Sequence, residues 1–363
     1  MDASASKLAH ENGEIQLKMA EQKNNRVLVT GGAGYIGSHT CIQLLEAGFE
    51  PVIVDNFSNS KPQVMQRLEQ ILGRSLTLIN ANIGDREAMD RVFKQQNVSA
   101  VVHFAGYKAV GESCEKPLMY FDNNVSGTVA LCEVMAANGV YDLIFSSSAT
   151  VYGDPHTVPI DESFPTSATN PYGRSKLMVE EVMRDLARVP GNPWRVSLLR
   201  YFNPVGAHES GLIGEDPQGI PNNLLPYVAQ VAVGKLPRLS VFGDDYDTVD
   251  GTGVRDYIHV VDLAQGHVKA LNFLRQQKPG CFTHNLGTGQ GYSVLQIVKA
   301  FEAASGREVP YDIKPRRAGD IATCYADAAK ARLELGWSAE FGVERMMVDT
   351  WRWQSQNPKG FDD

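Results

Sequence analysis

The chain has 363 residues, of which 43% are hydrophobic, and its 34 basic and 42 acidic side chains give a formal net charge of −8. This length and composition predict a large core, with one main domain and a smaller lobe. The acidic balance argues against general attraction to nucleic acid or an anionic membrane, and no apolar run approaches the ~20 residues of a membrane span.

Cysteine and histidine usage narrows the class further. The five cysteines are scattered without a C-x-x-C pair, which favours a reducing compartment, the cytoplasm, over a disulfide framework or zinc. The histidines show no H-x-x-x-H or HExxH spacing, so no metal site is predicted. Residues 1–24 are polar and carry no packing pattern, and we expect them to form a disordered extension.

From Arg26 onward, short β-rich runs alternate with helical stretches, which is the βαβ rhythm of a parallel sheet. One helix is predicted after the first strand and runs through Leu45, and a second is predicted over Val64 to Leu72. About six strands are expected, over residues 27–30, 52–55, 76–80, 100–104, 143–147 and 196–199. The fold predicted is α/β, a Rossmann-type doubly wound parallel sheet over residues 25–202. Residues 203–363 are expected to form mainly a smaller mixed α/β substrate-binding lobe, with some segments returning to the first domain.

A glycine-rich turn follows the first predicted strand. Gly31, Gly34 and Gly37 open a helix, the setting in which a backbone can approach a pyrophosphate at a positive helix end. Asp55 ends the second strand, where a carboxylate can accept hydrogen bonds from ribose hydroxyls and repel a 2′-phosphate. The pattern therefore predicts NAD rather than NADP, with a bare glycine turn as the alternative.

The pair Tyr172 and Lys176 has the spacing of two residues on one helix face. A phenol with a pKa near ~10 acts as a base at neutral pH only if a positive charge stabilises it. A lysine about 4 Å away at an effective dielectric of ~20 contributes ~4 kcal/mol, which would lower the phenol pKa by ~3 units. The pair predicts redox chemistry on an alcohol or sugar, and the alternative is an ordinary solvated helix face.

Longer motifs place these residues in a family. The stretches H-F-A-G (103–106), S-S-S-A-T-V-Y-G-D (146–154) and Y-G-R-S-K (172–176) resemble the extended short-chain dehydrogenases. The stretches K-A-V-G-E-S (108–113), R-Y-F-N-P-V-G-A-H (200–208), G-E-D-P-Q-G-I-P-N-N-L (214–224) and D-G-T-G-V-R-D-Y-I-H-V (250–260) are similar to its members that act on UDP-hexoses. The resemblance covers the chain from about Arg26 to the W-R-W-Q-S segment near its end.

The resemblance implies reversible C4 inversion of UDP-glucose and UDP-galactose, by transient hydride transfer to tightly held NAD through a 4-keto sugar. It implies that Tyr172 is the base, that Ser148 binds the same sugar oxygen and that Lys176 binds the nicotinamide ribose. It also implies a homodimer that packs helices around residues 115–138 and 172–188.

The implied contacts fall into two sets. The cofactor set is Gly31, Gly34, Tyr35, Ile36, Gly37, Asp55, Asn56, Asn82, Ile83, Phe104, Ala105, Gly106, Lys108, Asn123, Tyr172, Lys176 and Tyr201. The substrate set is Ser148, Tyr172, Phe202, Asn203, Asn223, Leu224, Phe242, Arg255, Tyr257, Arg317, Asp320 and Cys324. For the two arginines, forked contacts to a diphosphate compete with ordinary ion pairs to Asp256 or Asp320.

Two positions depart from the family pattern. Asn82 stands where the family often has an Asp beside the adenine amine, and an amide oxygen can still accept that hydrogen bond. Cys324 stands where members confined to unacetylated sugars have a Tyr. The small side chain predicts that UDP-GlcNAc and UDP-GalNAc are also interconverted, and the alternative is an inert buried thiol.

Three other functions compete with this interpretation. A nucleotide-sugar 4,6-dehydratase needs an Asp-Glu pair after the active-site hydroxyl, and Ala149 and Thr150 stand there instead. A UDP-glucuronate 4-epimerase would need a positive partner for the extra carboxylate, which the sequence does not identify. A non-catalytic dinucleotide-binding protein would not need Ser148, Tyr172 and Lys176 together.

Overall fold

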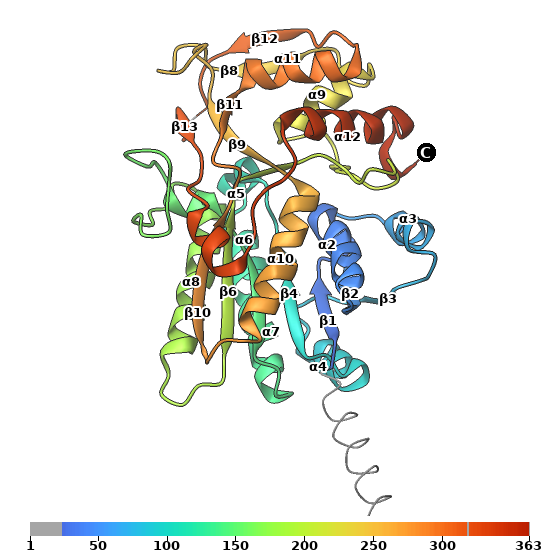
Figure 1. Cartoon of the computed structure of the whole chain (residues 1–363), viewed down its shortest axis with the longest axis vertical. Coiled ribbons are helices and arrows are strands. Elements are labelled where there is room, and N and C mark those ends of the chain that lie inside the picture. Colours follow the sequence, from blue (N-terminus) through green and yellow to red (C-terminus); the bar gives the residue numbers. More distant parts are fainter. Residues whose placement is uncertain (1–23, 318, 363) are drawn as a thin grey trace, which may run out of the picture.

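The structure is a computed structural model and describes residues 24–317 and 319–362 (Figure 1). The predicted disordered extension, apart from Asn24, lies outside the described residues. Figure 1 shows a parallel sheet flanked by helices in its lower part, and a smaller group of helices and short strands above it.

The main sheet has seven parallel strands in the order β10-β6-β5-β4-β1-β2-β3. Its strands are β1 (Arg26–Thr30), β2 (Glu50–Asp55), β3 (Thr77–Asn80), β4 (Ala100–His103), β5 (Asp142–Ser148), β6 (Arg195–Tyr201) and β10 (Gly280–Leu286). The strand order reverses between β1 and β4, the switch point at which open α/β sheets bind ligands. The doubly wound sheet expected from the sequence is confirmed.

Helices cover both faces of this sheet, because successive strand side chains point to opposite sides. Val27 and Val29 face one core with helices α2 (Tyr35–Glu46), α3 (Gln63–Leu72) and α10 (Val260–Leu274). Leu28 faces the opposite core with α4 (Arg86–Gln96), α7 (Gly127–Ala137) and α8 (Pro171–Arg188). Shorter helical segments on the chain between β4 and α8 are α5 (Val110–Glu115), α6 (Pro117–Tyr120), the π-helical η1 (Phe121–Ser126) and the 3-10 turn η2 (Ala149–Tyr152).

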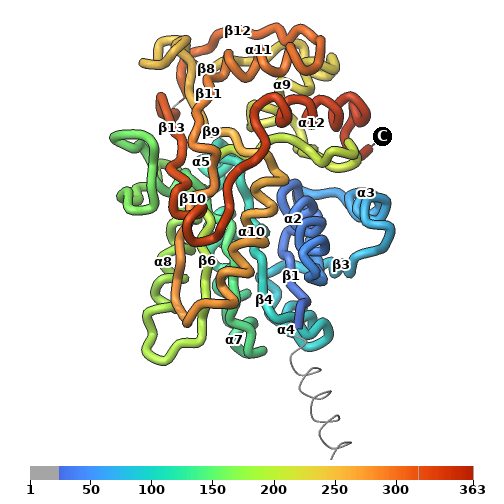
Figure 2. The backbone as a smooth tube through the Cα atoms, in the orientation of Figure 1, coloured from blue at the N-terminus to red at the C-terminus, as the bar shows by residue number. Residues whose placement is uncertain are grey.

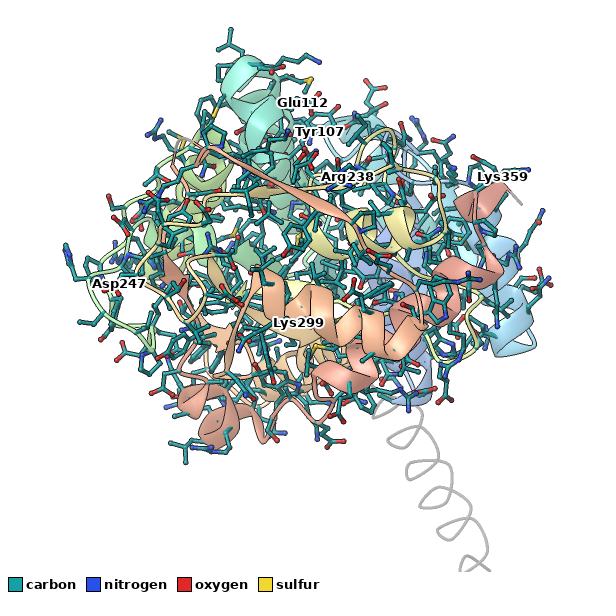
Figure 3. The ribbon with its side chains drawn as sticks, turned by 90° about the horizontal axis from the view of Figure 1, so that it is seen from above. Tyr107, Glu112, Arg238, Asp247, Lys299 and Lys359 are labelled. Atoms are coloured by element: carbon teal, nitrogen blue, oxygen red, sulfur yellow. The ribbon has the colours of Figure 1, made fainter. Side chains whose placement is uncertain are left out.

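The upper part has its own core. Its helices are α9 (Leu224–Ala232), α11 (Val294–Ser305) and α12 (Val343–Gln356), which pack around Val228, Phe301 and Met347. Its strands are β7 (Asn203–Val205), β8 (Leu239–Phe242), β9 (Val254–His259), β11 (Gly291–Ser293), β12 (Tyr311–Lys314) and β13 (Thr323–Cys324). The remaining short segments are η3 (Ala331–Leu335) and η4 (Gly360–Asp362). In Figure 3, seen from above, Lys299 on α11 and Arg238 beside β8 lie over the middle of the molecule, and Asp247 and Lys359 lie at opposite edges.

The expected number of strands was one too few. The six strands predicted before residue 203 form as expected, to within two residues at each end. The seventh, β10, comes from much later in the chain and pairs in parallel with β6, from Gly280 opposite Arg195 to Leu286 opposite Tyr201. Figure 2 shows the chain descending from the upper part to add this strand at the edge of the sheet.

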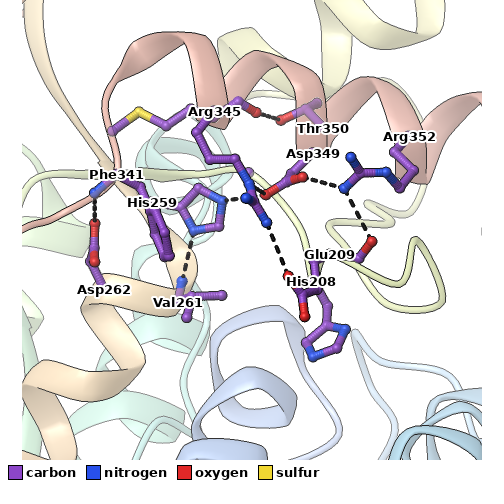
Figure 4. A network of polar contacts seen from close by, with 12 residues as sticks. His208, Glu209, His259, Val261, Asp262, Phe341, Arg345, Asp349, Thr350 and Arg352 are labelled. Atoms are coloured by element: carbon purple, nitrogen blue, oxygen red, sulfur yellow. Dashed lines mark hydrogen bonds and ion pairs between the residues drawn. The ribbon is translucent and has the colours of Figure 1, made fainter.

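An ion-pair network joins α12 to the loop after β7 and to the junction of β9 with α10 (Figure 4). The buried Asp349 of α12 receives hydrogen bonds from Arg345 and Arg352, and His259 lies 3.3 Å from the same carboxylate. Arg345 and Arg352 also bond to Glu209 in that loop.

Among the helices of the described residues, none combines the length and the apolar character that a membrane span needs.

Candidate active site

The glycine turn after β1 fits a bound dinucleotide. Gly31 has φ +69°, and a Cβ there would lie 2.8 Å from the backbone nitrogen of Ala105, so only glycine allows this close approach. Helix α2 begins just after Gly34, with no side-chain cap and no acidic residue in its first turn. Its unpaired N–H groups therefore offer a positive helix end to a phosphate.

Asp55 lies at the end of β2 beside this turn. Its side chain is buried and accepts hydrogen bonds from the backbone N–H of Ala33, at 3.0 Å, and from the N–H of Phe57 and the hydroxyl of Ser60. The carboxylate therefore fixes the glycine turn against the loop after β2. This is the edge of the sheet at which the sequence placed a ribose contact.

The end of β5 carries Ser148. Its Oγ accepts hydrogen bonds from the backbone N–H of Thr150, at 3.2 Å, and from the Thr150 hydroxyl, at 3.0 Å. Ser148 thereby caps the turn η2. The Ser148 side chain also interacts with Tyr172 and lowers the pKa of its phenol.

Tyr172 lies in the first turn of α8. Asn170 caps this helix by accepting the Gly173 N–H at 2.9 Å, and Pro171 takes the position that needs no donor. The Tyr172 N–H is bonded at 3.1 Å to the hydroxyl of Ser113, a buried residue of α5. Ser113 thus gives a structural role to the K-A-V-G-E-S stretch.

Lys176, one turn further along α8, is buried at 5% exposure. Its Nζ donates to the carbonyl of Ser146 at 2.9 Å and lies 4.9 Å from the ring centre of Phe145. A Cβ at Gly106 would lie 3.7 Å from Nζ, which places the H-F-A-G stretch next to the lysine. Burial lowers the pKa of Lys176 to about 8.

The predicted lowering of the Tyr172 pKa by Lys176 was wrong for this structure. Burial raises the pKa of Tyr172 above its usual value, and the interaction that acts in the other direction is the hydrogen bond from Ser148. Lys176 Nζ lies 6.0 Å from the centre of the phenol ring and is directed at the Ser146 carbonyl. The serine, rather than the lysine, favours the phenolate here.

Asn124 is a structural residue that the sequence interpretation did not single out. It is buried in the π-helical segment η1, where its amide oxygen accepts the Tyr107 N–H and its nitrogen donates to the Tyr107 carbonyl and the Ser175 hydroxyl. It therefore joins the segment after β4 to α8. Neighbouring Asn123 bonds to the Asn124 side chain. A π-helical turn has no sequence signal of its own, so these contacts of Asn124 could not be predicted from the sequence.

A carboxylate links the two predicted binding sets. Glu215 accepts hydrogen bonds from Lys108 Nζ and Asn223 Nδ2, each at 2.8 Å. Its backbone carbonyl accepts the indole N–H of Trp353 on α12. The structure thus brings a predicted cofactor residue and a predicted substrate residue to one side chain that the sequence did not single out.

Three of the predicted nucleotide contacts in the upper part lie together. The Arg317 guanidinium lies 4.5 Å from the Phe242 ring centre and pairs with Asp320 at 3.1 Å, the ion pair that was the alternative interpretation. Arg255 instead bonds to the carbonyl of Val254. Asp256 accepts from Thr288, Gly289 and Ala326.

Cys324 lies closer to the catalytic turn. It is buried in β13 and packs in a cluster with Val151, Tyr152 and Phe202. Burial raises the pKa of its thiol to about 11, so the side chain is a neutral, small hydrophobic group.

The other predicted residues take several environments. The Tyr35 hydroxyl donates to the Gly206 carbonyl, and Asn82 and Asn56 accept the N–H groups of Gly84 and Ser58. The Tyr201 hydroxyl is bonded to Ser146. Ile83, Phe202 and Tyr257 are buried, whereas Asn203 is exposed at the start of β7 and Leu224 begins α9.

Within the described residues, no group of three or more acidic, His or Cys side chains could hold a metal ion.

A doubly wound sheet with a glycine turn at its switch point and a Ser-Tyr-Lys group beside it defines an extended short-chain dehydrogenase. Residues 28–350 match the family described as GDP-mannose 4,6 dehydratase. The UDP-glucose 4-epimerase of Bacillus subtilis (strain 168) is 62% identical over 335 residues, which cover 92% of this chain and 98% of that protein.

Two solved structures are similar over the same extent. The UDP-glucose 4-epimerase of Bifidobacterium longum, in complex with NAD+ and UDP, has a TM-score of 0.89 at 56% identity and covers 92% of this chain and 99% of its own. That of Stenotrophomonas maltophila, with bound NAD and formylated UDP-arabinopyranose, has a TM-score of 0.89 at 53% identity, with 92% and 98% covered. The chain belongs to the extended short-chain dehydrogenases, and within them to the UDP-glucose 4-epimerases.

Proposed function

We propose that this protein interconverts UDP-glucose and UDP-galactose by inverting C4 of the hexose, with NAD as its cofactor. The observation that carries the proposal is the group formed by Ser148, Tyr172 and Lys176 at the carboxyl edge of the sheet, beside the glycine turn. Gly31, the N-terminus of α2 and Asp55 would hold NAD, which would supply a reversible acceptor for the C4 hydride.

The chain's own residues move the proton. The phenolate oxygen of Tyr172 accepts the proton of the sugar 4-hydroxyl and gives it back after inversion, which leaves a 4-keto sugar in between. Ser148 donates a hydrogen bond to the reacting oxygen, and the buried Lys176 supplies positive charge and binds the nicotinamide ribose. Ala149 and Thr150 offer no carboxylic acid after Ser148, so the elimination of a 4,6-dehydratase lacks its acid and base.

Cys324 supports a wider substrate range. Its small side chain packs beside the catalytic turn, in the cluster that contains Val151 and Phe202. We infer that the pocket has room for the N-acetyl group of UDP-GlcNAc and UDP-GalNAc.

The proposal extends to the domains of the chain, its location in the cell and its oligomeric state. We infer an NAD-binding domain over residues 25–202 and a mainly substrate-binding lobe over 203–363, to which α10 and β10 are exceptions. The free thiols of Cys41, Cys114, Cys132, Cys281 and Cys324 support a cytoplasmic location. Exposed Leu118 and Met178, on the contacting helices α6 and α8, support a homodimer through these helices.

The test is to incubate the purified protein with UDP-galactose, with no added nucleotide, and to follow UDP-glucose by NMR. Appearance of UDP-glucose establishes both C4 inversion and retained NAD. If the product appears only after NAD is added, the activity stands and the tight retention fails. If it appears under neither condition, the proposed reaction is wrong.

A further inference from the structure

We propose that Thr150 is a positioning residue, whose hydroxyl directs the proton of Ser148 toward Tyr172, and toward the reacting sugar oxygen once the substrate is bound. The inference rests on the proposed function and assigns a role to a residue of the catalytic turn that neither binding set contains. It depends on the hydrogen bonds around one oxygen atom, Ser148 Oγ.

That oxygen receives two hydrogen bonds from the same residue. The Thr150 backbone N–H lies 3.2 Å from Ser148 Oγ, and the Thr150 hydroxyl donates to it at 3.0 Å. A serine hydroxyl has one proton to donate and two lone pairs that accept. Thr150 therefore occupies both lone pairs, and the Ser148 proton is left to point elsewhere.

In this structure the recipient of that proton is Tyr172, which directly precedes the glycine packed against Thr150 and whose pKa the Ser148 side chain lowers. A proton donated to the phenol oxygen favours the phenolate and lowers the pKa of Tyr172, whereas burial raises it. If the Thr150 hydroxyl were absent, the Ser148 hydroxyl could rotate and offer a lone pair to the tyrosine proton instead. The phenol would then be held in its neutral form.

The backbone keeps Thr150 in this position. A Cβ at Gly173 would lie 3.0 Å from the Thr150 carbonyl oxygen and 3.2 Å from its hydroxyl, so the glycine that follows Tyr172 lets α8 approach the turn closely. The Gly153 N–H bonds to the Thr150 carbonyl at 3.3 Å, and the Ser167 N–H bonds to the next carbonyl, that of Val151. The hydroxyl of Thr150 is thus fixed between Ser148 and the first turn of α8.

A purely structural role would need less. The backbone N–H of Thr150 by itself satisfies the cap that Ser148 provides to η2. The added hydroxyl bond changes the orientation of the Ser148 proton, so its loss should alter an ionisation and not only stability.

The experiment compares Thr150→Val with Thr150→Ser in the full chain with its cofactor. Valine keeps the shape and removes the hydroxyl, whereas serine keeps the hydroxyl and removes the methyl. The pH dependence of kcat for UDP-galactose is measured for each variant. Thr350→Val is the matched control, because the Thr350 hydroxyl bonds to the Met346 carbonyl on its own helix α12.

For Thr150→Val we expect kcat to fall roughly tenfold, the size of one lost hydrogen bond between neutral groups. The base must be deprotonated to act, so a higher phenol pKa moves the acidic limb of the kcat profile to higher pH, by about one unit. Thr150→Ser should restore the wild-type limb. In a Ser148→Ala background, Thr150→Val should shift the limb no further, because Thr150 acts through Ser148.

A second readout does not depend on turnover. The phenolate absorbance of Tyr172 is titrated as the difference between each protein and its Tyr172→Phe counterpart, and Thr150→Val should raise the apparent pKa. If Thr150→Val keeps the wild-type pH profile and the wild-type phenol titration, the inference is overturned. Equal shifts in Thr150→Ser and Thr150→Val would also overturn it. If the wild type does not convert UDP-galactose, the proposed function fails while the titration still decides the role of Thr150.

Discussion

At the scale of single residues, burial and hydrogen bonding together determine the pKa values of the site. Burial raises the pKa of Tyr172 and lowers that of Lys176 to about 8, because a low-dielectric environment disfavours both charged forms. The Ser148 hydrogen bond favours the phenolate. The ionisation of the catalytic base therefore depends on its serine neighbour.

The role of Tyr172 as base gives the first prediction. Tyr172→Phe should lower kcat by roughly 10²- to 10⁴-fold, since the proton-transfer group is lost while the ring still packs. The variant should still carry NAD, which is measured by absorbance after the protein is denatured. Tyr141→Phe, which removes a hydroxyl bonded to the Ala136 carbonyl, is the matched control. Near-normal turnover in Tyr172→Phe would rule this base out.

Substrate range at Cys324 gives the second prediction. Cys324→Tyr should reduce turnover of UDP-GlcNAc relative to UDP-glucose roughly tenfold or more, because the ring fills the space of the acetyl group. Cys324→Ala should preserve the wild-type ratio. The ratio of kcat/KM for the two substrates is the measurement. An unchanged ratio in Cys324→Tyr would contradict the pocket argument.

At the scale of elements, a buried ion pair fixes α8 to the sheet. Glu180, one turn after Lys176, is fully buried and bonds to Arg200 of β6 at 2.9 Å and to the Ser147 hydroxyl of β5. The Arg200 guanidinium also lies 4.7 Å from the Tyr152 ring centre. Helix α8, which carries Tyr172, is thereby held against the strands that end at the site.

This pair gives the third prediction. Glu180→Leu should lower the free energy of unfolding by about 3–5 kcal/mol, because it leaves the Arg200 charge buried and unpaired. The double variant Glu180→Leu, Arg200→Met should lose less than Glu180→Leu, because both charges are removed together. Denaturant unfolding of the three proteins measures both values. A double variant that is less stable than the single would contradict this, and would show that Arg200 stabilises the fold without Glu180, through contacts such as that with the Tyr152 ring.

Asp349 gives a prediction about acid stability. Burial raises the pKa of Asp349, but the hydrogen bonds from His259 and Arg345 outweigh it and leave the pKa lowered. A carboxyl whose pKa is lower in the folded state stabilises the fold at pH values above its pKa in the unfolded chain, ~3.9. This contribution is lost as the pH falls through the pKa of the folded state.

Asp349→Asn should therefore be less stable than the wild type at pH 7, and the difference should shrink as the pH falls below about 4. Denaturant unfolding of both proteins across this range is the measurement. Asp312→Asn is the control, because its pair with Arg238 lies on the surface. A difference that does not depend on pH would show that the Asp349 charge is not the cause.

At the scale of the whole molecule, the exposed apolar side chains on α6 and α8 predict self-association. Leu118 is 82% exposed and Met178 43% exposed, on helices that contact each other. We expect a homodimer in sedimentation equilibrium, and Leu118→Lys combined with Met178→Lys should yield a monomer. Leu333→Lys, at another exposed leucine on η3, should leave the dimer intact. A wild-type monomer at micromolar concentration would refute the predicted interface.

Local patterns predicted much of the fold and of the site. The first six strands, the glycine turn and the placement of Tyr172 and Lys176 on one helix follow from residues close in the sequence, whose geometry is set by the periods of strands and helices. The strand β10 could not be found this way, because its position beside β6 depends on a chain reversal through the upper part.

The amino-acid sequence by itself determined the class of fold, the glycine turn and the identity of the Ser-Tyr-Lys group, because these depend on local periodicity and on motifs. Tertiary structure alone decided how that group is tuned. Thr150 meets Ser148 within a local turn, but the approach of Tyr172 depends on packing α8 onto that turn through Gly173. Glu215 joins Lys108 to Asn223 across more than a hundred residues. Burial, which shifts the pKa values of Tyr172 and Lys176, exists only once the whole chain has folded around them.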